Sequence, residues 1–179
     1  MVGQVQRAAV FDVNVLVGAV AGGNSPFRSW PSPPPVSDNP YADCVGIVND
    51  ACEFGLWISP HILTNVVRVL TEPNDGFDWD LEAAEEYAAL LVEIADASAG
   101  GVVAPTVRVT DCADFEDNRI LELAAEVGAD VIVSEDHHLT DLSPWNGIPV
   151  LRPREFASRI DAARRAARTG RKRSSRRTR

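Results

Sequence analysis

The segment that decides the fold is residues 117–136, DNRILELAAEVGADVIVSED. Apolar residues recur at helical spacing in its first part, which predicts a helix over 117–127 that ends at Gly128. Its second part contains Val131–Val133, a short apolar run typical of a buried strand. A helix followed directly by a buried strand is the repeating unit of an α/β fold.

The same alternation extends along the rest of the chain. Short apolar runs predict strands at residues 8–11, 56–59 and 149–151, and a β-rich segment covers residues 102–109. Helical spacing predicts further helices at residues 14–20, 42–54, 60–70, 79–97 and 153–168. We therefore expect an α/β domain, in which helices flank a parallel β-sheet of about four to five strands on both faces.

Length and composition predict one domain with a basic extension. The chain has 179 residues, of which 45% are hydrophobic, enough to bury a core. We expect the domain to span residues 1–158, with a Pro- and Gly-rich loop at 21–40. The end of a terminal helix and a basic, disordered tail are expected over 159–179. The formal net charge is −9, but residues 164–179 hold nine basic residues and no acid, so the rest of the chain carries −18.

The cysteines and the hydropathy pattern predict a cytoplasmic protein. Cys44, Cys52 and Cys112 are odd in number and lack the spacing of metal or redox motifs, which favours reduced thiols. No apolar run is long enough to span a membrane, and none near the N-terminus is typical of a signal peptide. We therefore expect no membrane partner.

Three carboxylates are expected at one edge of the sheet. Asp12 directly follows the first strand, Asp117 begins a helix, and Asp136 follows Val131–Val133. That helix, at ~1.5 Å per residue, and the strand after it, at ~3.3 Å per residue, cover similar distances, so Asp136 returns to the level of Asp117. In parallel sheets, ligands bind at the carboxyl ends of the strands.

Carboxylates that crowd together must share a proton or be neutralised by a cation. Oxygen ligands without a nearby set of His or Cys favour Mg²⁺ or Mn²⁺, which can bind a phosphate oxygen and activate a water molecule. The chemistry predicted is phosphodiester hydrolysis without a covalent enzyme intermediate. Each residue alone also has a simpler explanation: Asp117 as an acid at a helix N-terminus, and Asp12 and Asp136 as turn residues.

Four segments of the chain resemble the PIN-domain nuclease family. They are VFDVNVLV at 10–17, DFEDN at 114–118, VIVSED at 131–136, and GIPVL at 147–151 followed by Pro153 and Glu155-Phe156. The resemblance covers about residues 8–158, and the order and spacing of the segments are its most specific feature. It implies a PIN-like three-layer sandwich and a metal-dependent ribonuclease, often the toxin of a bacterial toxin–antitoxin pair.

The resemblance also implies roles for individual residues and partners. Asp12, Asp117 and Asp136 would be the catalytic residues and the metal ligands for Mg²⁺ or Mn²⁺. Ser134 would orient the site through its hydroxyl, and Asn14 would support the first loop. RNA would be the substrate, with an antitoxin protein and a second copy of the chain as further partners.

Two positions depart from the family pattern. The segment SPHILTNVVRVL at 59–70 matches the family's second strand and helix, but Asn65 stands where the family usually has Glu. Val13 replaces a usual Thr. A neutral amide in place of a carboxylate predicts weaker metal binding, which Asp114 or Glu116 could partly offset. The alternative interpretation is therefore a catalytically impaired PIN-fold module that binds nucleic acid or protein.

The two histidines beside Asp136 and the basic tail each have two interpretations. His137 and His138 could touch phosphate, but exposed turn residues are the simpler expectation. The basic tail could draw RNA to an acidic body by counterion release, or it could only improve solubility. The tail residues concerned are Arg171, Lys172, Arg173, Arg176, Arg177 and Arg179.

Three other classes of phosphate-handling protein are disfavoured. A haloacid-dehalogenase-like phosphatase needs a second Asp two residues after Asp12, where Asn14 stands. That class and the phosphate-receiver domains also need a lysine at the site, and the only lysine, Lys172, lies in the tail. No Gly-Lys-Ser/Thr sequence is present, which excludes a P-loop.

Overall fold

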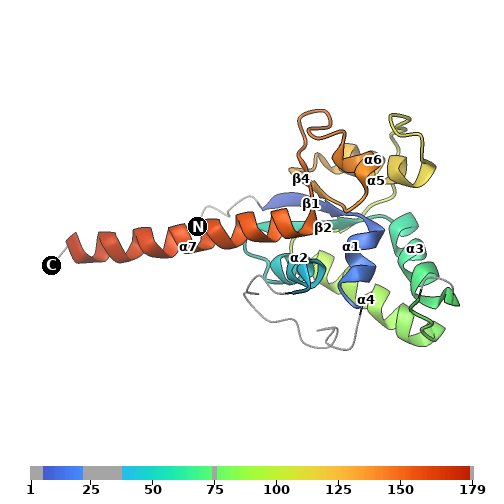
Figure 1. Ribbon diagram of the computed structural model, residues 1–179, viewed down its shortest axis with the longest axis horizontal. Coiled ribbons are helices and arrows are strands. Elements are labelled where there is room, and N and C mark those ends of the chain that lie inside the picture. The colour runs from blue at the N-terminus through green and yellow to red at the C-terminus, as the bar shows by residue number, and fades with distance from the viewer. Residues whose placement is uncertain (1–5, 22–37, 74–75, 178–179) are drawn as a thin grey trace.

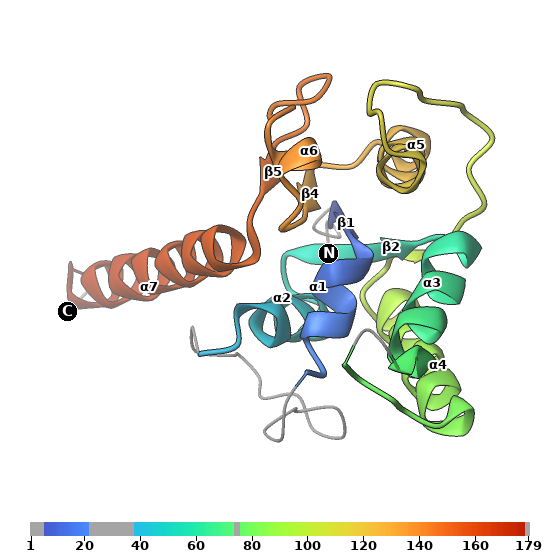
Figure 2. The same cartoon turned by 45° about the vertical axis from the view of Figure 1, so that its right-hand side comes forward.

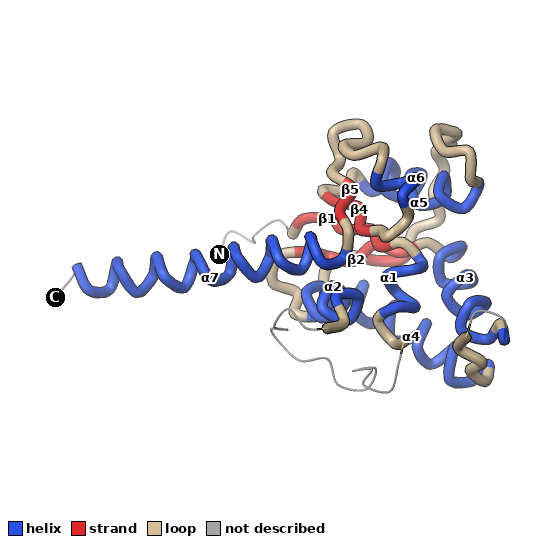
Figure 3. The backbone as a smooth tube through the Cα atoms, in the orientation of Figure 1, coloured by secondary structure: helices blue, strands red, loops and turns tan. Residues whose placement is uncertain are grey.

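The computed structural model describes residues 6–21, 38–73 and 76–177, with side chains up to Thr169 (Figures 1 and 3). The strands are β1 (Arg7–Phe11), β2 (Phe54–Ile58), β3 (Gly101–Val102), β4 (Val131–Val133) and β5 (Val150–Leu151). The helices are α1 (Val13–Gly18), α2 (Pro40–Asn49), α3 (Pro60–Thr71), α4 (Leu81–Ala97), α5 (Phe115–Val127), α6 (His137–Thr140) and α7 (Pro153–Arg177).

The five strands form one parallel sheet in the order β3-β2-β1-β4-β5. The chain adds β2 and β3 on one side of β1, and then β4 and β5 on the other. The strand order therefore switches between β1 and β4, where Phe11 pairs with Val133 at the carboxyl ends. Crevices at such switch points are the usual ligand sites of open α/β sheets. The expected fold class is confirmed.

Helices cover both faces of this sheet. In Figures 1 and 2, α1 to α4 lie on one side, and α5 and α6 lie on the other. The core lies between these layers. The central strand β1 contributes three apolar residues to it, Ala9, Val10 and Phe11, which are at most 1% exposed. Phe156 of α7 packs edge-on against both Phe11 and Phe54, which fixes the first turn of α7 to the sheet.

Local signals in the sequence set several helix ends as expected. The Ser59 hydroxyl accepts a hydrogen bond from the Ile62 amide at 3.2 Å, and Pro60 occupies the first turn of α3. Gly128 ends α5 with a φ of 60°, in the left-handed region that glycine adopts without a steric penalty. α2 begins earlier than expected because the Asn39 side chain caps it.

The β-rich prediction for residues 102–109 was wrong beyond β3. Pro105 cannot donate to a ladder, and carboxylates of α5 take the place of a neighbouring strand. Glu126 accepts hydrogen bonds from the amides of Thr106 and Val107 at 2.8 and 3.2 Å. The Val109 amide donates to Glu122 at 3.2 Å. These contacts hold an irregular segment against α5.

The terminal helix is longer than expected. We predicted an end near Arg168 and a disordered tail, but the backbone of α7 is helical to Arg177 and projects from the body (Figure 1). Arg164 anchors the helix to the body through ion pairs with Asp50 at 2.9 Å and Glu53 at 2.6 Å. Most of the expected loop at 21–40 lies outside the described residues.

The structure bears on two further expectations, which concern the cysteines and membrane-spanning helices. The three cysteines form no disulfide bond with one another, and their reduced state remains a prediction. Among the described helices, none combines the length and the apolar character that crossing a membrane requires.

Candidate metal centre

Asp12 is fixed at the end of the central strand. Its amide donates to the Val133 carbonyl at 2.9 Å, and its own carbonyl accepts from the amides of Val15 and Leu16 at the start of α1. Asp12 is the N-cap residue of α1, but its side chain makes no capping hydrogen bond. The carboxylate is therefore left to face the site, although the residue is only 8% exposed.

A hydrogen-bonded network joins the loops after β1 and β4. The hydroxyl of the fully buried Ser134 donates to Asp12 Oδ2 at 2.5 Å, and Asn14 Nδ2 donates to the same oxygen at 2.6 Å. The amide of Asp136 donates to the Ser134 hydroxyl at 2.9 Å, and the Glu135 amide donates to Asn14 Oδ1. Burial raises the pKa of Asp12, while the bonds from Ser134 and Asn14 act to lower it.

Asp117 brings a buried carboxylate from α5. The helix is capped by Asp114, which accepts from the Glu116 amide at 2.7 Å, so capping does not explain Asp117. Asp117 is 7% exposed, and among the described residues no donor forms a hydrogen bond with its Oδ2 atom. Buried polar atoms are nearly always paired, and an orphaned carboxylate oxygen therefore indicates a missing positive partner.

The three aspartates lie within electrostatic range of one another. Burial, followed by the charges of Asp136, Asp12 and Asp114, raises the pKa of Asp117 to about 6, and His138 opposes this shift. His138 Nδ1 lies 3.6 Å from Asp117 Oδ2 and 3.4 Å from Asp136 Oδ1, so one imidazole contacts both carboxylates. The fold thus gathers the side chains that we proposed from the sequence, although their metal-binding role remains a prediction.

His137 and His138, which follow Asp136 in the sequence, lie close to the carboxylates of the site. Residues 137–140 form the one-turn helix α6, which we did not predict. Asp136 caps it by accepting from the His138 amide at 2.8 Å, and this turn brings the His137 and His138 imidazoles back toward Asp136. Both histidines are exposed, as expected for turn residues, but His138 also faces Asp117.

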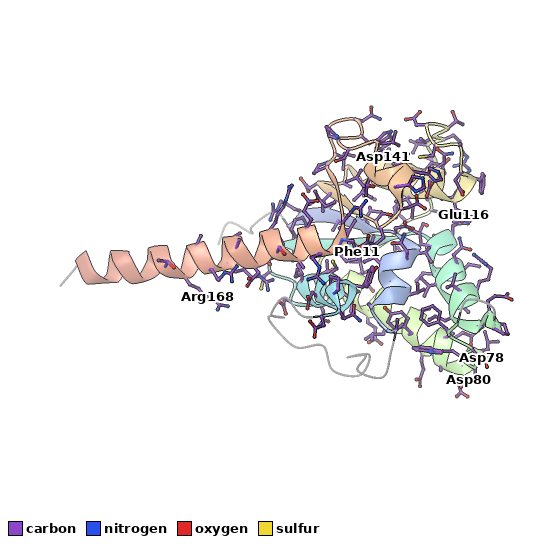
Figure 4. All side chains as sticks on the ribbon, viewed as in Figure 1. Phe11, Asp78, Asp80, Glu116, Asp141 and Arg168 are labelled. Atoms are coloured by element: carbon purple, nitrogen blue, oxygen red, sulfur yellow. The ribbon has the colours of Figure 1, made fainter. Side chains whose placement is uncertain are left out.

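A second group of polar side chains lies between α3 and α5. Asn65 Nδ2 donates to Glu116 Oε2 at 2.6 Å, and His61 Nε2 lies 2.6 Å from the same oxygen. Arg68 donates to Asn65 Oδ1 at 3.2 Å. Figure 4 labels Glu116 on the side of α5 near α3. Glu116 therefore brings a carboxylate next to the position where Asn65 replaces the expected Glu.

A small cavity connects this group to Asp12. Its volume is about 100 Å³. Its lining residues come mainly from α3 and α5, and are Asp12, Val13, His61, Ile62, Asn65, Arg68, Glu116 and Ile120. Sequence reasoning missed His61 and Arg68, although both stand at helical spacing from Asn65 and so share its face of α3.

The donor set suits a divalent cation. Carboxylates of Asp12, Asp117 and Asp136 supply hard oxygen atoms, which is the ligand type that Mg²⁺ and Mn²⁺ prefer. The orphaned oxygen of Asp117 is the observation that favours a cation over mere charge repulsion. With a cation bound, the chemistry available to such a site is attack of water on a phosphate ester.

A sequence model of the PIN domain matches residues 8–138. The matched region contains β1 from its second residue, β2 to β4, the three aspartates, Asn65 and both histidines of α6. No curated protein matches the sequence.

Proposed function

Because the chain belongs to the PIN-domain family, whose members generally have nuclease activity, we propose that it is a metal-dependent ribonuclease. The reaction would be hydrolysis of RNA phosphodiester bonds. The observation that carries the proposal is the buried Asp117 oxygen without a hydrogen-bond donor, next to the carboxylates of Asp12 and Asp136. This arrangement needs positive charge, which a divalent cation supplies.

Each residue of the site has a task that follows from its contacts. Asp12, Asp117 and Asp136 would hold Mg²⁺ or Mn²⁺, which when bound supplies a Lewis acid for a phosphate oxygen and for water. Ser134 and Asn14 hold the Asp12 carboxylate in one orientation by donating to the same oxygen. Such preorganisation lowers the reorganisation needed when substrate arrives.

The basic end of α7 supports RNA as the substrate. Residues 1–163 carry a formal charge of −18, which repels a polyanion, whereas the tail residues 171–179 carry six positive charges. Lys and Arg that neutralise phosphates release counterions, and this release gives binding without sequence specificity. We propose that the tail residues Arg171, Lys172, Arg173, Arg176, Arg177 and Arg179 increase affinity for RNA.

Truncation after Thr169 tests the role of the tail. This cut keeps Arg164 and its ion pairs with Asp50 and Glu53, so α7 stays anchored to the body. We expect weaker RNA binding, and a slope of log affinity against log salt that is shallower by up to about 4 for six lost phosphate contacts. An unchanged slope, measured by fluorescence anisotropy, would leave the tail as a solubilising extension.

A second candidate function is favoured by Asn65. Where the family usually has Glu, a neutral amide offers less attraction for a cation, which is what a PIN-fold module with impaired catalysis would show. Such a module would bind nucleic acid or protein without turnover. A toxin role with an antitoxin partner, a homodimeric state and a cytoplasmic location remain predictions from the resemblance and the composition.

The test of the nuclease proposal is cleavage of a mixed single-stranded RNA with Mg²⁺, with Mn²⁺ or with a chelator. We expect metal-dependent cleavage by the wild type, and a loss of about 100-fold or more in Asp12→Asn, because a direct ligand matters at least as much as the groups that support it. Asp141→Asn, which removes an exposed acid at the end of α6, is the control. Metal binding without cleavage by the wild type would favour the binding module.

A further inference from the structure

We propose that Asp117, Asp136, His137 and His138 form a transition-metal site that binds Zn²⁺ more tightly than Mg²⁺. The second part of the proposal rests on the proposed nuclease function: Zn²⁺ bound there takes Asp117 and Asp136 away from the catalytic cation and inhibits cleavage. We call these four residues the imidazole cluster. Its two histidines were expected to be plain turn residues, and the proposed hydrolysis assigns no task to them.

Three ligand atoms of the imidazole cluster, from Asp136, His137 and His138, lie close to one another, and Asp117 lies beside His138. His138 Nδ1 lies 3.4 Å from Asp136 Oδ1 and 3.6 Å from Asp117 Oδ2, and His137 Nδ1 lies 3.6 Å from Asp136 Oδ1. In tetrahedral Zn²⁺ sites, bonds of about 2.0–2.2 Å separate neighbouring ligand atoms by roughly 3.3–3.6 Å. One ligand atom each of Asp136, His137 and His138 lies within 4.8 Å of the others.

The buried carboxylate beside these histidines is the second observation, and it also supports the proposed catalytic cation. Asp117 is only 7% exposed. Its Oδ2 atom faces His138 and has no hydrogen-bond donor among the described residues. Surface histidines beside an acid are common and indicate little by themselves. A buried carboxylate oxygen that has no hydrogen-bond donor and lies 3.6 Å from the His138 imidazole favours a ligand that binds to both.

The chemistry of the donors determines which metal binds. Imidazole nitrogen is a good ligand for Zn²⁺, Co²⁺ and Ni²⁺, whereas Mg²⁺ prefers oxygen and retains much of its water. The groups on the other side of the site, Asp12, Asn14 and Ser134, form a network without imidazole. A soft cation is therefore drawn toward α6 and a hard cation toward β1, and both need Asp117 and Asp136.

A binding experiment without RNA tests the site directly. Metal-free, full-length protein is titrated with Zn²⁺ and with Mg²⁺ by calorimetry, and with Co²⁺ by its visible spectrum, which reports nitrogen ligands and coordination number. We expect tighter binding of Zn²⁺ than of Mg²⁺, and a tetrahedral Co²⁺ spectrum. In His137→Ala/His138→Ala, Zn²⁺ affinity should fall by about tenfold or more. Equal Zn²⁺ affinity in this variant and the wild type would overturn the proposal.

Control variants separate the cluster from general effects. His61→Ala removes the only other histidine of the chain, which lies on α3, and should leave Zn²⁺ affinity unchanged. A loss in His61→Ala equal to that of the double variant would count against the cluster. Conservative His138→Gln should reproduce most of the loss of Zn²⁺ affinity while the far-ultraviolet circular dichroism stays that of the folded protein.

Asp12→Asn distinguishes a failure of this proposal from a failure of the nuclease proposal. The variant keeps the imidazole cluster, so Zn²⁺ should still bind even if no RNA is cleaved under any condition. If the wild type cleaves RNA with Mg²⁺, added Zn²⁺ should inhibit it, and the double variant should need about tenfold more Zn²⁺ for the same inhibition. Tight Zn²⁺ binding without inhibition would overturn the competition and leave the binding site.

Discussion

The two edges of the candidate metal centre have hydrogen bonds of similar length but very different exposure to solvent. At the β1/β4 edge, Ser134 is fully buried and donates to Asp12 at 2.5 Å. At the α3/α5 edge, His61 and Glu116 lie 2.6 Å apart, but their side chains are 38% and 54% exposed. A short hydrogen bond thus occurs both in a buried, fixed group and in a solvated one. The burial of the side chains, and not the bond length, shows which of the two it is.

The difference follows from what holds each side chain. Asp12 and Ser134 follow paired strands whose register is set by the ladder between Phe11 and Val133. Glu116 and Asn65 stand on separate helices and meet only through their side chains. Solvent competes with contacts of the second kind, which contribute roughly 0–1 kcal/mol. We therefore expect substitutions at the β1/β4 edge to have larger effects than those at the α3/α5 edge.

Ser134→Ala gives the largest effect among the variants that leave every carboxylate in place. It removes the hydroxyl that donates to Asp12 and accepts from the Asp136 amide, so cleavage should fall by about 10- to 100-fold. Ser98→Ala is the matched control, because Ser98 is also fully buried and hydrogen-bonded but lies outside the site. Equal losses of specific activity in the two folded variants would contradict a role specific to Ser134.

The buried carboxylate of Asp117 on α5 should also affect the pH dependence of stability. Asp117 has an ordinary pKa of 3.8 and a folded-state pKa of about 6, so between these values the folded protein holds a proton that the unfolded chain has lost. The free energy of unfolding of the metal-free protein should therefore fall as pH rises from about 4 to about 6, by on the order of 1–2 kcal/mol.

Urea unfolding in the presence of chelator measures this dependence. Asp117→Asn should make the curve flatter in that interval, and Asp141→Asn, which removes an exposed acid, should leave it unchanged. The opposite result is a free energy of unfolding that rises with pH in the wild type, with this rise lost in Asp117→Asn. It would mean that a cationic group stabilises the ionised Asp117 carboxylate.

The smallest effects are expected at the α3/α5 edge. Asn65→Glu should raise Mg²⁺ affinity by about threefold and Glu116→Gln should lower it by a similar factor, because both groups are solvated. The double variant Asn65→Glu/Glu116→Gln keeps the number of carboxylates and should return the affinity to the wild-type value. No change in either single variant, measured by calorimetry, would show that this edge lies away from the cation.

The order of helices and strands, and the meeting of three aspartates, could be predicted because both follow from local spacing. A helix of given length followed by a strand returns the chain to the same level, which places Asp117 near Asp136. The parallel sheet then adds Asp12. Helix ends at Ser59 and Gly128 were equally local, since one residue supplies each cap.

What could not be predicted depends on contacts between distant segments. Residues 103–109 have the composition of a strand, but the carboxylates of Glu122 and Glu126 hold them as an irregular segment. Glu116 meets Asn65 only because α5 packs beside α3. The imidazole of His138 turns toward Asp117 because of a four-residue helix whose pattern is too short to detect.

The central position of β1 in the sheet determines how fast its backbone amides exchange with solvent. Amides of a strand with a hydrogen-bonded neighbour on each side exchange with solvent only when the whole sheet opens, whereas a one-turn helix such as α6 can unravel alone. The Asp12 amide, bonded to Val133, should therefore be among the slowest to take up deuterium. Asp12 at the end of β1 therefore keeps its position while α6 unfolds locally. A bound cation can leave and return during such local unfolding without unfolding of the whole protein.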